Sequence, residues 1–329
     1  MVFVETGHAW NLKELLYELS LCKLLFSRLP IVIYSHSLIM ENLKKNKSLS
    51  MKFIVPIVSA IPLRLISRCA GGLANVRAGK LLQPIIRFFS KKYNIELSEA
   101  ELHIPDFKTF NEFFDRKLKK NSRTVDTGLK SIVSPVDGTI LSFGSLKEGL
   151  VIETKGTGSR LDDLLSMPGF KKRFIDGDFL VIYLSPRDYH RIHSPLNANI
   201  IGYSHIPGRL YPVNSFAVNN IDRLFSKNER LITYMETDKN KLFALVKVGA
   251  TNVGSIRVTY DETLKTNKIF SRKSKEIFMK GIPVKKGDEI AWFELGSTVI
   301  LLFEKNMVQL GKINSGDRVL MGKAIAALK

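Results

Sequence analysis

One dipeptide of this chain could cut its own backbone. Gly296-Ser297 stands directly before Thr298-Val299-Ile300-Leu301-Leu302-Phe303, a run apolar enough to form a buried strand. The Ser297 hydroxyl could attack the Gly296 carbonyl, and elimination from the resulting ester would leave a pyruvoyl group on the downstream chain. Glycine tolerates the distorted backbone that such an attack needs. A Gly-Ser pair is most often a turn, so this chemistry requires partners elsewhere.

A base for such an attack is offered by His190 and His193. Ser185, Pro186 and Asp188 resemble a helix start, with a capping residue, proline at the first helical position and an acid three residues after the cap. The spacing therefore predicts a short helical turn that projects both histidines to one side. Two such imidazoles could divide proton chemistry between them. The alternative is surface or metal-binding histidines, but no third ligand supports a metal site.

A group that orients the base completes the usual arrangement for activating a hydroxyl. Asp137 is a candidate, because Ser134-Pro135-Val136-Asp137-Gly138 predicts a tight turn that leads into a strand. Taken alone, Asp137 is more simply explained as an ordinary turn residue.

The elements around these residues predict an α+β fold. Apolar runs separated by turn signals indicate a mostly antiparallel β body over residues 131–329, and no internal repeat is evident. The expected strands are Thr139 to Phe143, Phe179 to Leu184, Leu231 to Glu236, Leu242 to Gly249, Val253 to Tyr260 and Thr298 to Phe303. Residues 51–130 are expected to be helical, including an aromatic helix within 109–118 that ends near three lysines.

The charge predicts an acidic partner. The formal net charge is +19 with a pI near 9.8, and no Asp or Glu occurs between Met51 and Ile95. Basic residues alternate there with apolar ones at helical spacing, which is typical of helices at an anionic membrane surface. The alternative is an amphipathic helix packed on its own core. Nucleic acid is a weaker alternative, because no recognition motif is present.

Residues 1–50 form an N-terminal extension of uncertain status, either an upstream addition or a misassigned start. The stretch Leu24 to Met40 is too short and too interrupted for a membrane span, and it lacks the features of a signal peptide. The chain has two cysteines, Cys22 and Cys69, in different apolar contexts, which favours a reducing, cytoplasm-facing location.

Taken together, these segments resemble the phosphatidylserine decarboxylase proenzymes, a pyruvoyl-dependent family, from about Met51 to the C-terminus. The matching stretches are Phe107-Lys108-Thr109-Phe110-Asn111-Glu112-Phe113-Phe114, Ser134-Pro135-Val136-Asp137-Gly138, Ser185-Pro186-Arg187-Asp188-Tyr189-His190-Arg191-Ile192-His193-Ser194-Pro195, Asn228-Glu229-Arg230, Gly249-Ala250-Thr251-Asn252-Val253-Gly254-Ser255-Ile256 and Leu295-Gly296-Ser297-Thr298.

The resemblance implies a role for each candidate residue. Ser297 would be the self-cleavage nucleophile and then the covalent pyruvoyl cofactor, His193 its base and Asp137 the orienting carboxylate. His190 would handle substrate and transfer protons. Cleavage between Gly296 and Ser297 would give a beta chain, 1–296, and an alpha chain, 297–329, which form a heterodimer or a higher oligomer. Pro212 departs from the pattern, because some relatives carry serine there.

The implied reaction converts phosphatidylserine to phosphatidylethanolamine and CO2 through a Schiff base, with the pyruvoyl group as electron sink. The expected location is peripheral, on the cytoplasmic face of the cell's inner membrane, with anionic membrane as partner and with no nucleic acid or metal. Two other functions fit parts of the sequence: a pyruvoyl decarboxylase for a soluble amino acid, and a non-catalytic β binding module.

Overall fold

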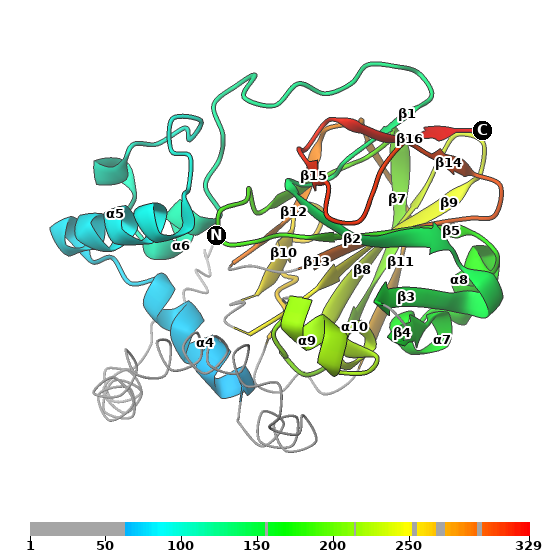
Figure 1. The fold of residues 1–329 in the computed structure, drawn as a ribbon, viewed down its shortest axis with the longest axis horizontal. Helices are drawn as coiled ribbons and strands as arrows, with labels where there is room; N and C mark the ends of the chain where they lie inside the picture. The colour runs from blue at the N-terminus through cyan, green and yellow to red at the C-terminus, as the bar shows by residue number, and fades with distance from the viewer. Residues whose placement is uncertain (1–62, 155–156, 214, 252–254, 268–273, 295–297) are drawn as a thin grey trace, which may run out of the picture. The chain divides into compact units, whose positions relative to one another are not determined.

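The computed structural model describes residues 63–154, 157–213, 215–251, 255–267, 274–294 and 298–329 (Figure 1). The chain divides into two units, Met1–Ala60 and Ile61–Lys329, and every described residue belongs to the second unit. The predicted N-terminal extension, the first twelve positions of the predicted helical region and the Gly296-Ser297 pair lie outside the described residues.

An eight-stranded sheet forms the body of the second unit, and each of its pairings is antiparallel. Its strands, in spatial order, are β11 (Lys275–Val284), β7 (Ala198–Ile206), β8 (Arg230–Glu236), β9 (Leu242–Val248), β13 (Thr298–Phe303), β5 (Asp178–Tyr183), β2 (Gly138–Ser145) and β15 (Arg318–Val319). The prediction of a mostly antiparallel β body is therefore confirmed.

Smaller sheets and short helices complete the body. One three-stranded sheet contains β1 (Ser131–Val133), β16 (Ala324–Leu328) and β14 (Val308–Leu310). A second contains β10 (Ile256–Val258), β12 (Glu289–Phe293) and β6 (Arg191–His193). The strands β3 (Leu150–Thr154) and β4 (Thr157–Arg160) form a two-stranded sheet. The short helices are α7 (Leu161–Leu164), α8 (Pro168–Lys171), α9 (Ser215–Asn220) and α10 (Leu224–Lys227), with 3-10 turns η3 (Lys147–Gly149) and η4 (Lys172–Phe174).

The centre of the large sheet is its most buried part. Every residue of β13 and of β9 is buried, because both strands have neighbours on each side and apolar residues on both faces. A continuous apolar run such as Val299 to Phe303 is the pattern expected of a strand covered on both faces. Full burial of each such side chain is worth about 1.5–3 kcal/mol, so this strand is a principal anchor of the fold.

A helical region precedes the body, with α4 (Leu63–Ala74), η1 (Gly79–Leu81), α5 (Leu82–Tyr93), η2 (Ile104–Asp106) and α6 (Phe110–Phe114). Helix α5 ends where Asn94 takes a left-handed conformation (φ 52°) and its N–H bonds to the Ser90 carbonyl. Lys91 and Lys92 in the last turn complement the helix dipole. Among the described residues, no helix is long and apolar enough to cross a membrane.

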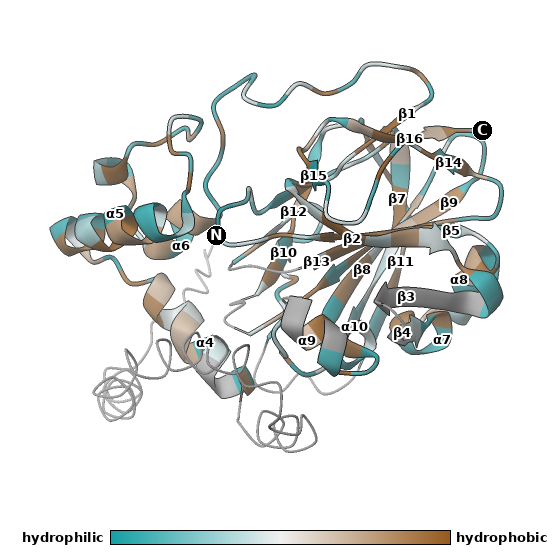
Figure 2. Cartoon of the chain, viewed as in Figure 1, coloured by the Kyte–Doolittle hydropathy of each residue, from teal (hydrophilic) through white to brown (hydrophobic). Residues whose placement is uncertain are grey.

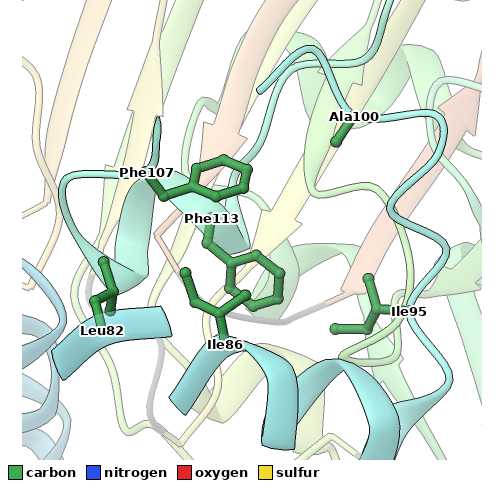
Figure 3. Close-up of a cluster of buried hydrophobic side chains, with 6 residues drawn as sticks. All are labelled: Leu82, Ile86, Ile95, Ala100, Phe107 and Phe113. Atoms are coloured by element: carbon green, nitrogen blue, oxygen red, sulfur yellow. The ribbon is translucent and has the colours of Figure 1, made fainter. Parts of the chain in front are cut away.

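Helix α5 carries apolar residues on two faces. Leu82 and Ile86 pack into a small core with Ile95, Ala100, Phe107 and Phe113 (Figure 3). The alternative of a helix packed on its own core is therefore confirmed for this face. The second face is exposed, because Ile85 is 51 % and Phe88 69 % exposed, and Leu81, just before the helix, is 75 % exposed. Figure 2 shows hydrophobic and hydrophilic residues following one another along α5.

Helix α6 is shorter than predicted. It begins after Thr109, whose hydroxyl accepts a hydrogen bond from the Glu112 N–H at 3.1 Å. It ends at Phe114 with Asp115 as its C-cap, so the three lysines expected at its end lie beyond it. The chain leaves the helix early because Asp115 and Arg116 make contacts to the body, described below.

Candidate active site

The register of the large sheet brings the predicted site segments to one edge. Thr298, at the start of β13, lies opposite Tyr183 at the end of β5 and Val248 at the end of β9. Tyr183 in turn lies opposite Thr139 on β2, and Val248 lies opposite Arg230 on β8. Neighbouring strands run in opposite directions, so each strand either begins or ends at this row. The predicted site segments are the ones that directly precede or follow these strand ends in the chain: Asp137, residues 185–195, Asn228-Glu229, Gly249 and Ser297.

Strands β2 and β5 come unusually close at this edge. A Cβ atom added to Gly138 would lie 2.5 Å from the Tyr183 carbonyl oxygen, so a side chain at position 138 would collide with the backbone of β5. Glycine after Asp137 is thus required by close packing, and this contact holds Asp137 beside the end of β5.

Residues on both sides of the Leu295-Gly296-Ser297 segment are anchored. Upstream, the Glu294 carboxylate accepts hydrogen bonds from Ser255 Oγ (2.8 Å) and Arg257 Nε (3.2 Å) and forms an ion pair with Lys265 (3.1 Å). Burial alone would raise the pKa of Glu294, but Lys265, Ser255 and Arg257 outweigh it and lower that pKa. Downstream, Thr298 is fully buried in β13, and its Oγ1 has no partner among the described residues.

The histidine segment is a turn and a strand, so the predicted helical turn is wrong. Asp188 caps the turn as expected, because its carboxylate accepts from the Ser185 N–H (2.7 Å) and hydroxyl (2.6 Å). The chain then enters β6, where His193 pairs with Glu289 of β12. Pairing with β12 engages backbone groups that a helix would have used internally, and tertiary contacts therefore override the local helix signal.

His190 lies buried beneath α6 and is neutral. Its ring packs on Phe114 with centroids 4.2 Å apart, and its Nδ1 is 2.8 Å from the Asp188 carbonyl oxygen. Burial, and then the positive charge of Arg116, lower the pKa of His190 to about 3. A carbonyl oxygen only accepts, so Nδ1 carries the hydrogen and Nε2 keeps its lone pair. This Nε2 is buried and has no partner among the described residues.

His193 is fixed in the same tautomer by a different carbonyl. Its Nδ1 donates to the Gly287 oxygen at 2.7 Å, and its Nε2 accepts from the Tyr189 hydroxyl at 3.0 Å. Burial lowers the pKa of His193, although the Gly287 hydrogen bond acts in the opposite direction. The imidazole is therefore a neutral base whose lone pair is held in place by Tyr189.

Asp137 lies at the site, but its hydrogen bonds go to Arg123 and to the backbone. Arg123 donates to both carboxylate oxygens, with the shortest contact 2.6 Å, and the Met321 N–H donates to Oδ1 at 2.8 Å. Of the charged groups around His193, Glu289 raises the pKa of the imidazole most, Arg191 lowers it, and Asp137 raises it by a smaller amount. In the described contacts, the Gly287 carbonyl orients His193.

Asp137 and His193 come from two similar segments that interlock. Residues 132–140 (IVSPVDGTI) and 192–200 (IHSPLNANI) share a serine-proline turn, which is a short internal repeat that the sequence analysis missed. The Val133 N–H bonds to the Pro195 oxygen at 3.1 Å, and the His193 N–H bonds to the Pro135 oxygen at 2.8 Å. These reciprocal bonds place His193 next to the Asp137 turn.

The repeat separates the structural role of Asp137 from its charge. Asn197 occupies the equivalent position and accepts from the Lys286 N–H at 2.8 Å, just as Asp137 accepts from the Met321 N–H. An amide oxygen thus suffices to hold the turn. The negative charge at position 137 forms the ion pair with Arg123 and raises the pKa of the neighbouring His193.

At the β8 and β9 end of the row, the Asn228 side chain joins the segment around Tyr211 to the segment that begins at Gly249. This side chain accepts from the Tyr211 N–H and donates to the carbonyls of Tyr211 and Gly249, each at 2.9 Å. These bonds hold the 207–213 segment at the same edge. Pro212 lies in this segment and supplies no hydroxyl there.

Three residues that sequence reasoning did not single out contact the predicted site: Tyr189, Arg116 and Arg123. Tyr189 lies inside a matched motif, so its position was visible although its partner was not. Arg116 and Arg123 reach the site only through tertiary contacts and leave no local signal. Within the described ranges, no group of three or more His, Cys, Asp or Glu side chains could hold a metal ion.

Comparison with known proteins identifies the family. The model of the family described as phosphatidylserine decarboxylase matches residues 110–327, and a second model, described as PSD, matches residues 59–94. A "phosphatidylserine decarboxylase proenzyme" of Brevibacillus brevis is 41% identical over 280 residues, covering 84% of this chain and 99% of that protein. A protein of the same description from Myxococcus xanthus is 45% identical over 247 residues, covering 75% of this chain and 87% of that protein. One from Vibrio parahaemolyticus is 37% identical over 277 residues, covering 82% of this chain and 96% of that protein.

The sheet with its histidine-bearing edge is thus the body of a decarboxylase, an enzyme of the carboxy-lyase class. The chain belongs to the phosphatidylserine decarboxylase family.

Proposed function

We propose that this chain is a proenzyme that cuts itself between Gly296 and Ser297 and then decarboxylates phosphatidylserine to phosphatidylethanolamine. The observation that carries the proposal is the row of strand ends at Thr298, Tyr183 and Thr139, beside which Asp137 and the histidine segment lie next to one another through the bond from the His193 N–H to the Pro135 carbonyl. The relatives named proenzymes support the same conclusion.

The cleavage step needs a base for the Ser297 hydroxyl. His193 is suited to this role because it is neutral, its Nδ1 is fixed by Gly287 and its Nε2 carries the lone pair. Asp137 raises the proton affinity of that imidazole through its charge. Glu294 and Thr298 hold the chain on either side of the cut.

The residues present fit a pyruvoyl group at position 297. The fully buried Thr298 Oγ1 and His190 Nε2 have no partners among the described residues, and buried polar atoms normally have one. When formed, the group supplies a carbonyl that condenses with the substrate amine and withdraws electrons as CO2 leaves. Neutral His190 can take the proton that the substrate ammonium must lose and return it to the carbon that lost CO2.

The two chains made by cleavage would remain associated as a heterodimer. Residues 298–329 contain β13, which pairs with β5 and β9, and β16, which pairs with β1. The small chain therefore contributes a central buried strand to the sheet of the large chain. Dissociation would expose the whole apolar run from Val299 to Phe303.

We further infer that the helical region docks this enzyme peripherally on an anionic membrane, on its cytoplasmic face. Leu81, Ile85 and Phe88, three or four residues apart, form an exposed apolar ridge at the start of α5. The same stretch of chain carries five exposed cations, namely Arg77, Lys80, Arg87, Lys91 and Lys92. Apolar side chains that insert into the membrane interface, with cations beside them, are the arrangement that binds anionic lipid. Anionic lipid is enriched in the cytoplasmic leaflet.

Ser297→Ala should leave the chain whole and without decarboxylase activity, because no hydroxyl remains to attack Gly296. The wild-type chain should give fragments 1–296 and 297–329 on a denaturing gel, co-purifying under native conditions, with the smaller one blocked to Edman sequencing. Ser315→Ala, in an exposed turn, is the control and should cleave normally. Cleavage and activity in the Ser297→Ala protein would refute the proposed mechanism.

Asp137→Asn should fold and yet cleave at least about tenfold more slowly, because the amide keeps the turn while the charge that assists His193 is lost. Thermal melting and the time course of fragment formation measure the two effects separately. Asn197→Asp changes the equivalent turn in the repeat and should cleave as the wild type does. Equal cleavage rates for Asp137→Asn and wild type would remove the carboxylate from the mechanism.

His190→Ala should cleave normally but lose at least about a hundredfold in kcat, because the proton acceptor for the substrate amine is gone. Phosphatidylserine turnover in mixed micelles measures this loss, after the gel has confirmed processing. His103→Ala, at an exposed position, is the matched control. A fully active His190→Ala enzyme would rule out the proposed role of this histidine.

The triple variant Leu81→Ser, Ile85→Ser, Phe88→Ser should bind anionic vesicles at least about tenfold more weakly, because the apolar ridge no longer inserts. Flotation with vesicles that contain an acidic phospholipid measures binding. Phe278→Ser, which alters an exposed aromatic residue on β11, is the control and should float like the wild type. Unchanged flotation of the triple variant would place the lipid contact elsewhere.

A further inference from the structure

Three consecutive residues at the end of α6 hold the histidine-bearing turn. The Phe114 ring packs on His190 at 4.2 Å, the Asp115 carbonyl accepts from Arg191 Nε at 2.7 Å, and Arg116 donates to the Arg187 carbonyl at 3.1 Å. The segment Phe114-Asp115-Arg116 therefore contacts the chain before, at and after His190. Its position is fixed in turn by Phe113, which lies in the small helical core.

Arg116 is an unusual cation for a protein interior. It is only 4 % exposed, and within the described residues its guanidinium donates to two carbonyl oxygens, those of Phe114 (3.5 Å) and Arg187. Its Nε is buried and has no partner there. Buried arginines usually pair with a carboxylate, which cancels most of their field. The charge of Arg116 therefore acts on its surroundings.

The carboxylates near Arg116 are occupied by other partners. Asp188 accepts from Ser185 and from Arg318, the latter at 2.7 Å, while Asp137 is held by Arg123. Of the charged groups that act on His190, Arg116 has the larger effect and Asp188, on the turn itself, opposes it. The imidazole ring packs on Phe114, and the backbone carbonyl of His190 accepts from the Phe293 N–H at 3.1 Å.

We infer that Arg116 is a positioning residue for His190, which clamps the turn and keeps the imidazole unprotonated so that Nε2 presents its lone pair to the substrate amine. This inference rests on the proposed role of His190. Burial is the first cause of the low pKa of His190, and Asp188 acts against it by favouring the protonated ring, whose Nε2 could not accept a proton. The positive charge of Arg116 opposes that effect of Asp188.

The first test measures the protonation of His190 directly, without turnover. In the uncut Ser297→Ala chain, the imidazole NMR signals of His190, assigned by their loss in His190→Ala, should remain those of the neutral ring at about pH 5.5. Arg116→Met or Arg116→Gln should raise the proton affinity of His190 at least about tenfold, and Arg116→Lys should preserve the original titration. Arg223→Met, at a half-exposed arginine, is the control.

The second test follows the reaction. In cleaved Arg116→Met enzyme, the fall of kcat on the acidic side of the pH profile should move to higher pH by at least about one unit relative to the wild type, with KM little changed, because His190 takes up its proton at a higher pH. Arg116→Lys should restore the wild-type pH profile.

The NMR titration tests the role of Arg116, whereas the activity of His190→Ala tests the proposed function. A protonated His190 at about pH 5.5 in the parent chain, or an unchanged titration in a folded neutral variant, would overturn the role of Arg116. The parent measurement holds even where the Arg116 variants do not fold. A shifted titration together with a fully active His190→Ala enzyme would keep Arg116 as the residue that sets the protonation of His190 and refute only the catalytic role of His190.

Discussion

The pairing of β13 between β5 and β9 is the constraint on which the rest of this structure depends. It sets Thr298 level with Tyr183 and Val248, and thereby aligns the ends of β2, β5, β13, β9 and β8 in one row. A slip of one residue would turn every side chain of β13 to the opposite face, and the close packing of both faces opposes such a slip. The proposal for Ser297 rests on this alignment, because Ser297 directly precedes Thr298 in the chain.

Electrostatics at this edge keep two neutral imidazoles among charges that are mostly compensated. Asp137 pairs with Arg123, Asp188 with Arg318, and Glu294 with Lys265. Each histidine donates its Nδ1 hydrogen to a backbone carbonyl, which fixes the tautomer without adding a charge. Burial then disfavours protonation of either ring. Arg116 differs from these paired residues, because its hydrogen-bond partners in the described contacts are the carbonyl oxygens of Phe114 and Arg187.

The helical region and the site share a continuous packed cluster. Phe89 of α5 contacts Phe114 with ring centroids 6.2 Å apart, and Phe114 contacts His190 at 4.2 Å. One face of α5 thus supports the histidine turn through α6, while an adjacent face carries the exposed apolar ridge. This arrangement explains why the sequence favoured both a core-packed helix and a surface helix: α5 is apolar on two sides, and each side has its own use.

The sequence by itself determined the β body and its principal strands, because runs such as Thr298 to Phe303 are apolar over their whole length and burial of such runs is a local property. It also singled out Asp137, His190 and His193, since their motifs are contiguous. Only the tertiary structure decided that the histidines lie on a turn and a strand, because pairing with β12 outweighs the helix-start signal at Ser185. The partners Tyr189, Arg123 and Arg116, and the interlocked repeat, were likewise decided by contacts between segments far apart in the chain, which leave no periodic pattern in the sequence.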